Sequence, residues 1–161
     1  MKNIIISIII LGVYLFNLSL LGSDSIINKI PPQEYSKWEV LLDDEVWVGW
    51  TEYSEIFWGK SISKLPFSIQ TIANILEDRE NYKNVFDRIT TSKIVGEDIV
   101  YIILDMPFPF ASRDYIVKNT QKHVNNERIY QFLAIEHKSI PINSENVRLI
   151  NAAGEWRLLP L

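Results

Sequence analysis

The sequence predicts an α+β fold in which a curved antiparallel sheet packs against a helix. Strand-like runs separated by short turns open the domain, one apolar helical stripe follows, and further strand-like runs fill the rest of the chain. Closely spaced hairpins imply antiparallel pairing, and a helix segregated from such a sheet is the α+β arrangement. A length of 161 residues suits one domain.

The first part of the domain predicts three strands and one helix. A polar entry segment, residues 25–37, predicts a linker or short helix. The strand-like runs that follow are residues 38–42, 46–53 and 56–62. In the helix, apolar residues recur at i, i+3, i+4 and i+7 from Ile69, which places them on one stripe. We expect the helix to open at Pro66, or to begin later with Ser68 as its N-cap.

The second part predicts strands throughout. The runs are residues 89–95, 98–104, 114–119, 129–136, 147–152 and 156–159. Gly96-Glu97 and Asn125-Asn126 have the composition of tight turns. The run 99–104 is apolar on both faces and therefore needs an apolar layer on each side. A helix covers one side in this prediction, and a second helix or a ligand-filled cavity covers the other.

The connection between two of these strands is the most distinctive stretch. Pro107 and Pro109 cannot donate ladder hydrogen bonds, so a regular strand stops there. We expect Phe108 and Phe110 to find an apolar environment, because adjacent exposed aromatics are unusual. With Phe67 they form either an apolar gate for a ligand or a packed connector.

The first 23 residues predict a secretory signal peptide, followed by the domain at 24–161. A positive start with Lys2 precedes an almost wholly apolar run, residues 4–21. An uncleaved membrane anchor is the alternative, because about 18 apolar residues can span a bilayer. Leu20-Leu21-Gly22 resembles a bacterial lipobox, but Ser23 replaces the cysteine that would carry the lipid. Either reading predicts an exported protein, periplasmic or secreted, or held at the membrane by residues 4–21.

Composition excludes several function classes. A net charge of −4 argues against a general nucleic-acid binder. The absence of cysteine excludes disulfides and thiolate chemistry, and two histidines are too few for a His-rich metal site. We find no phosphate-binding glycine loop, nucleophile elbow or metal-spaced cluster. The sequence therefore predicts no cofactor, no metal and no catalytic residue.

Four segments, in order, resemble landmarks of the START family, the steroidogenic acute regulatory protein-related lipid-transfer domains. They are the opening Trp38-Glu-Val-Leu with its hairpin, the helix exit Leu76-Glu-Asp78 with Phe86-Asp87, the segment Pro107 to Tyr115, and Val147-Arg148 with Gly154-Glu-Trp156-Arg-Leu-Leu-Pro160. The resemblance runs from about Glu34 to the last residue.

The resemblance implies a helix-grip fold, in which an antiparallel sheet wraps a long C-terminal helix and encloses a tunnel for one lipid without any cofactor. The sequence departs from this pattern in two ways. It ends at Leu161, so we expect the grip helix to be missing and the domain to be incomplete at its C-terminus. Some members of the family have an arginine that faces the tunnel and pairs with an acidic residue on the preceding strand. In this sequence Asn119 stands at the arginine position and Asp105 lies near the acidic position, so the resemblance does not imply this polar pair here.

The predicted ligand-binding residues come from alternation and from the resemblance. Arg113, Tyr115, Val117 and Asn119 share one strand face, which the resemblance turns toward the cavity. The full predicted set is Tyr101, Ile103, Asp105, Phe108, Arg113, Tyr115, Val117, Asn119, Tyr130 and Phe132. Ordinary core packing is the alternative for the apolar members. The Arg113-Asp114 pair is interpreted as a structural anchor of the strand entry.

The leading hypothesis is a non-enzymatic protein that holds a lipid or other apolar ligand between sheet and helix, with lipid transfer as one form of this function. The enzyme alternative is a polyketide cyclase or aromatase of the same superfamily, which requires Asp105, Arg113 and Tyr101 to meet in one pocket. The third alternative is a membrane-tethered interaction module, with residues 4–21 as the anchor and the apolar loop against the bilayer.

Overall fold

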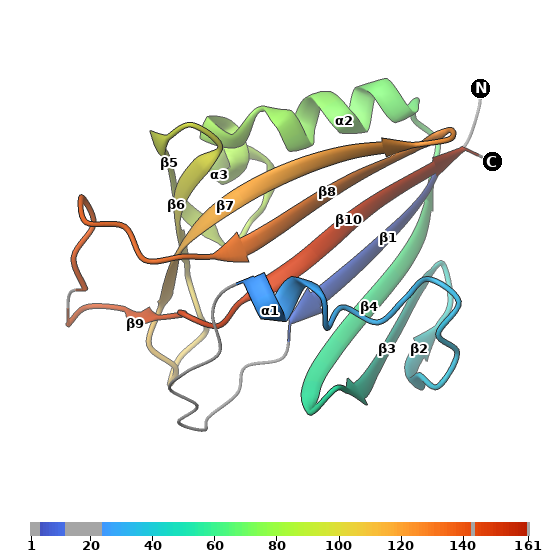
Figure 1. Ribbon diagram of the computed structural model, residues 1–161, viewed down its shortest axis with the longest axis horizontal. Coiled ribbons are helices and arrows are strands. Elements are labelled where there is room, and N and C mark those ends of the chain that lie inside the picture. The colour runs from blue at the N-terminus through green and yellow to red at the C-terminus, as the bar shows by residue number, and fades with distance from the viewer. Residues whose placement is uncertain (1–3, 12–23, 143, 161) are drawn as a thin grey trace.

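The computed structural model describes residues 4–11, 24–142 and 144–160 of the chain. Within these ranges the strands form one curved, ten-stranded sheet that is antiparallel except for the short strand β9 (Figure 1). Helices lie against its two faces. The predicted α+β fold, a curved antiparallel sheet with packed helices, is confirmed.

The first three strands after the entry segment form a meander. They are β2 (Glu39–Asp43), β3 (Val46–Tyr53) and β4 (Ile56–Leu65). The bounds of β3 match the prediction, whereas β4 continues three residues past the predicted end at Ile62. Ser54 and Glu55 form the turn between β3 and β4 with positive φ angles of 52° and 63°. This turn brings Trp58 of β4 onto the buried face beside Thr51.

The helical segment consists of α2 (Ile69–Glu77), the 3-10 turn η1 (Arg79–Asn81) and α3 (Tyr82–Val85). The expectation that Pro66 opens the helix is wrong. Ser68 is extended, with φ −76° and ψ 151°, and its side chain accepts a hydrogen bond from the backbone N–H of Thr71 at 3.1 Å. This N-cap satisfies a free helix donor and sets the start at Ile69. The predicted apolar stripe is confirmed, because Ile72, Ala73 and Leu76 are buried.

The later strands are β5 (Ile89–Gly96), β6 (Ile99–Leu104), β7 (Arg113–Val124), β8 (Glu127–Ala134), β9 (Val147–Arg148) and β10 (Ala153–Pro160). β7 continues to the turn at Asn125, whose φ of 54° suits the predicted tight turn. The predicted strand 147–152 shortens to β9, because its register pairs only with Arg113 and Asp114 at the start of β7.

The strand order is β2-β3-β4-β1-β10-β8-β7-β6-β5. β1 (Ile4–Leu11) lies between β4 and β10 and pairs antiparallel with both. These residues belong to the predicted leader, and residues 12–23 lie outside the described part of the chain. The signal peptide or anchor stays a prediction. In the described ranges, no helix combines the length and the apolar character needed to cross a bilayer.

The two faces of the sheet carry separate cores. We call them the α2 face and the α1 face, after the helices that contact them; α1 (Asp24–Ile27) is the short helix near the N-terminus. On the α2 face, the stripe of α2 packs on Tyr130 and Leu158. On the α1 face, Ile26 and Trp58 pack with Leu133 and Ala153. In β6, Val100 and Ile102 are buried with Val117 on the α2 face and Tyr101 is buried on the α1 face, so the apolar run 99–104 is covered on both sides.

Candidate functional site

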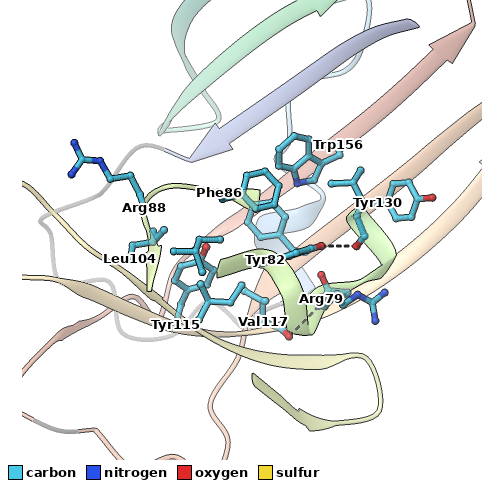
Figure 2. A pocket seen from close by; sticks show the side chains of 14 residues that line it. Arg79, Tyr82, Phe86, Arg88, Leu104, Tyr115, Val117, Tyr130 and Trp156 are labelled. Carbon is cyan, nitrogen blue, oxygen red and sulfur yellow. Dashed lines mark hydrogen bonds between the residues drawn. The ribbon is translucent and has the colours of Figure 1, made fainter. Parts of the chain in front are cut away.

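A cavity of about 410 Å³ lies between the α2 face of the sheet and the helical segment. Figure 2 shows side chains of the cavity wall converging from η1, α3 and the sheet strands. The helical side and the start of β5 contribute Leu76, Arg79, Tyr82, Phe86, Arg88 and Ile89. The sheet contributes Ile102, Leu104, Tyr115, Val117, Asn119, Tyr130, Phe132 and Trp156.

Strand alternation and register bring the sheet residues to one face. Tyr115, Val117 and Asn119 are two positions apart on β7, so their side chains point the same way. Tyr115 pairs with Ile102 of β6, and Asn119 pairs with Phe132 of β8. Directly paired residues share a face, so three strands contribute to one wall.

Aromatic rings of the helical side, Tyr82 and Phe86, contact one another and the Trp156 ring of the sheet. The Phe86 ring lies 5.8 Å from Trp156 and 5.3 Å from Tyr82, the second pair at 87° between planes. Edge-to-face contacts of this kind add to the free energy of apolar burial. Tyr82 is fixed further, because its hydroxyl donates to the Leu76 carbonyl at 2.6 Å. The cavity is therefore apolar and bounded by side chains with defined positions.

Burial controls the ionisation of two tyrosines in the wall. Desolvation raises the pKa of Tyr82 to about 12, partly offset by the nearby Arg79 guanidinium. Desolvation also raises the pKa of Tyr115 to about 12, with a smaller contribution from Tyr82. Both phenols are neutral at physiological pH, so Tyr82 keeps the proton that it donates to the Leu76 carbonyl and the Tyr115 hydroxyl can donate to a ligand.

The charged groups of the cavity wall are arginines. Arg79 forms an ion pair with Asp98 at 2.8 Å, and Asn119 donates to the Asp98 carbonyl at 3.1 Å. Arg88 is exposed in the turn directly before β5. None of the wall residues is an aspartate or glutamate. Elsewhere in the described ranges, no group of three His, Cys, Asp or Glu residues could hold a metal ion.

Half of the predicted ligand-binding residues line this cavity. They are Tyr115, Val117, Asn119, Tyr130 and Phe132. Ligand binding by these residues stays a prediction.

The placement of Tyr101 and Ile103 at the cavity is wrong. Tyr101 pairs with Ile116, and Ile103 with Asp114, so both side chains lie on the α1 face. Their neighbours on β6, Ile102 and Leu104, line the cavity instead.

Three further predicted residues also lie outside the cavity wall. Asp105 and Phe108 belong to the β6–β7 connection, where both are exposed. Arg113 has the predicted strand face, but its side chain lies at the strand entry and donates to the Ala111 carbonyl. Strand alternation assigns a side chain to one face of the sheet. The position of the helices decides how far along the strand the cavity extends, and the cavity ends before these three residues.

Sequence reasoning missed the helical side of the cavity. Phe86 and Trp156 belong to landmarks of the family resemblance, which was the available signal. The sequence did not assign Arg79, Tyr82 or Arg88 to the cavity, because η1, α3 and the turn before β5 are too short to show a periodicity that assigns a residue to a face.

The exposed connector corrects another expectation. Phe108 is 97% exposed, Phe110 60% and Phe67 51%. The expectation that these rings find an apolar environment in a packed connector is therefore wrong. The β6–β7 connection is short and returns directly into β7, so both of its phenylalanines remain at the surface.

Asp114 anchors the entry of β7 through Arg148, whereas Arg113 of the predicted anchor pair contacts the Ala111 carbonyl. Its carboxylate accepts from Arg148 at 2.7 Å and from the Tyr101 hydroxyl at 3.1 Å, all on the α1 face. Arg148 also donates to the carbonyl of Ile140 at 3.3 Å. Tyr101 is thus committed to a structural network on the face away from the cavity. The condition of the enzyme alternative, that Tyr101 meets Asp105 and Arg113 in one pocket, is not met.

Comparison with known proteins identifies the fold. No family model and no curated protein sequence matches the chain. Among solved structures, the STAR-related lipid transfer protein of Xanthomonas axonopodis has a TM-score of 0.61 at 14% identity, over 78% of this chain and 82% of that one. Human STARD10 has a TM-score of 0.59 at 14% identity, over 89% and 68% of the two chains. The lipid transfer and protein localization domain of human StarD13 has a TM-score of 0.58 at 13% identity, over 87% and 84%. The chain therefore has the fold of START lipid-transfer domains, as predicted.

Proposed function

We propose that this protein is a non-enzymatic lipid-binding protein that holds a lipid or other apolar ligand in the cavity on the α2 face. The observation that supports the proposal most is the cavity itself, with a volume of about 410 Å³ and a predominantly apolar and aromatic wall. Ligand sites of proteins have volumes of roughly 300–1,000 Å³ and mainly apolar walls with a few polar groups. The START-like fold is consistent with such a site.

Apolar burial supplies the affinity in this proposal. Each methylene group of a ligand that leaves water contributes about 0.8 kcal/mol. Ten buried methylenes would therefore contribute about 8 kcal/mol before the cost of immobilising the ligand. The hydroxyl of Tyr115 and the amide of Asn119 are polar groups that would orient the ligand.

We propose, as part of this function, that the β6–β7 connection contacts a membrane when the ligand is exchanged. Phe108 and Phe110 are exposed, and Met106 beside them is 36% exposed. The connection begins directly after Leu104, which lines one end of the cavity. Exposed aromatic groups at such a place would enter the bilayer interface, where apolar side chains are favoured.

The test is lipid extraction from vesicles by the full chain. Val117→Phe would place a larger side chain in the cavity, and we expect it to reduce extraction more than tenfold at unchanged secondary structure, since the binding space is lost. Val124→Phe is the matched control, because Val124 lies on the same strand and is 47% exposed at its end. A folded wild-type protein that extracts no lipid would refute the proposal, as would equal extraction by the two variants.

We also propose that the protein is exported. The apolar run 4–21 supports this localisation, with residues 1–23 acting as leader or anchor. One molecule cannot use Ile4–Leu11 both as a removed leader and as strand β1. The intact mass of the protein from its own cells separates these states. Loss of the first 23 residues would support a cleaved leader, whereas the full mass in a cytoplasmic fraction would refute export.

A further inference from the structure

We propose that the cavity selects amphiphiles with an anionic head group, held by the Arg88 guanidinium at one end of the cavity while the apolar chain lies against Phe86, Phe132 and Trp156. This inference rests on the proposed lipid-binding function and names its ligand class. It follows from the charges of the cavity wall and from their partners.

The positive charge of the wall is only partly neutralised. The wall contains two arginines and no carboxylate. Arg79 is paired with Asp98 at 2.8 Å, so its charge is already neutralised by the protein. Within the described ranges, Arg88 forms no ion pair: the ion-paired arginines are Arg79, Arg128, Arg148 and Arg157. One guanidinium therefore remains available to a ligand.

The position of Arg88 is set by the sheet. Its carbonyl accepts a hydrogen bond from the Asp105 N–H at 2.8 Å, which holds it beside the end of β6. The next residue, Ile89, pairs with Leu104, and Leu104 pairs with Arg113. Figure 2 shows the Arg88 guanidinium at one end of the cavity wall, directed away from the aromatic side chains. An apolar chain among the aromatic rings would thus place its head group near a cation.

A second guanidinium lies at the same end of the strands. Arg113 forms no ion pair with a described residue, and its side chain donates to the Ala111 carbonyl. Two carboxylates lie near Arg88: Asp87 precedes it in the chain, and the backbone of Asp105 is hydrogen-bonded to its carbonyl. Both are exposed, and neither forms an ion pair with Arg88. They weaken the long-range potential, as does the net charge of −4. Selection must therefore come from direct hydrogen bonds of the guanidinium, and not from attraction at a distance.

The donor chemistry fits a carboxylate or phosphate. A guanidinium offers paired N–H donors that match two oxygens of such a group, and it offers nothing to a quaternary ammonium head. Tyr115, in the wall beside Leu104, adds a neutral hydroxyl donor, because burial raises its pKa to about 12. A neutral ester head accepts weaker hydrogen bonds and a cationic head is repelled, so the same apolar chain would bind more weakly with either.

The experiment compares ligands that share one apolar chain. Binding of palmitate, methyl palmitate and hexadecyltrimethylammonium to the full chain is measured below their critical micelle concentrations, with acetate as the isolated head group. We expect palmitate to bind about fivefold or more tightly than methyl palmitate, the scale of one partly exposed charge-assisted hydrogen bond. Arg88→Gln should remove the difference, and Arg88→Lys should retain part of it.

Lys93→Gln is the matched control, because it removes one positive charge from β5, the strand that directly follows Arg88. Lys93 pairs with Tyr101 and therefore lies on the α1 face, away from the cavity. It should leave the palmitate preference unchanged. Equal binding of palmitate and methyl palmitate to the wild type would overturn the inference while the lipid-binding function stands. Retained preference in Arg88→Gln would also overturn it, as would acetate binding as tightly as palmitate. Failure of every long-chain ligand to bind would refute both proposals.

Discussion

Replacing the buried carboxylate at the entry of β7 should be among the most damaging conservative changes in this protein. Asp114 and Arg148 approach to 2.7 Å, and their side chains are only 2% and 7% exposed. Asp114→Asn keeps the shape of the side chain but removes its charge. The Arg148 guanidinium would then be a buried cation without a counter-charge.

The structure sets the magnitude of this effect. Removing one partner of a buried ion pair costs roughly 3–5 kcal/mol. Arg148 would keep its hydrogen bond to the Ile140 carbonyl, and the asparagine oxygen could still accept from Tyr101, so we expect the lower end, about 3 kcal/mol. For a chain of this length, that corresponds to a fall in Tm of roughly 6 to 12 °C.

Urea denaturation followed by tryptophan fluorescence measures the change, since the chain has five tryptophans. The matched control is Asp98→Asn. Asp98 pairs with Arg79 at 2.8 Å, nearly the same distance, but its side chain is 52% exposed. Solvent screens such a pair, so we expect a loss below about 1 kcal/mol.

Equal losses in the two variants would refute the reasoning, because the two pairs differ mainly in burial. A second arm uses Asp114→Asn together with Arg148→Met, which replaces the cation by an apolar side chain of similar length. We expect the double variant to recover part of the stability lost in Asp114→Asn. No recovery would mean that the loss does not come from the unpaired cation.

Three further outcomes follow from individual contacts. Burial raises the pKa of Tyr82 and Tyr115 to about 12 from the usual 10.0, so the folded state holds both phenolic protons more tightly than the unfolded state. The resulting stability is fully present below pH 10 and is lost as the pH rises toward 12. In urea titrations at increasing pH, the Tyr82→Phe and Tyr115→Phe variants should therefore lose less stability than the wild type. A methyl group on Gly49 would lie 2.4 Å from the Trp47 ring, so Gly49→Ala should destabilise the fold by about 1–3 kcal/mol by chemical denaturation; a neutral result would mean that the ring moves freely. Ser68→Ala removes the N-cap of α2 and should cost about 1 kcal/mol, measured by thermal unfolding, with Ser68→Asp retaining the stability.

The local sequence pattern was sufficient to predict features that depend on a single periodicity or on the residue types of a turn. The stripe of α2 and the shared face of Tyr115, Val117 and Asn119 followed from helical and strand periodicity alone. The turn at Asn125 followed from a side chain that tolerates positive φ. These features depend on interactions within a few residues, which the sequence determines directly.

Tertiary structure decided what periodicity leaves open. β6 is apolar on both faces, so alternation could not tell whether Tyr101 or Ile102 lines the cavity; the register against β7 decided it. The apolar run at Ile4–Leu11 fits a leader as well as a strand, because a short apolar run carries no period that separates them. The exposure of Phe108 likewise depends on what packs around the connection. The burial of a side chain is determined by contacts between segments that are distant in the sequence. The sequence by itself determined α2, most of the strands and the residues that share each face, and only the packing of sheet against helices decided which face encloses the cavity.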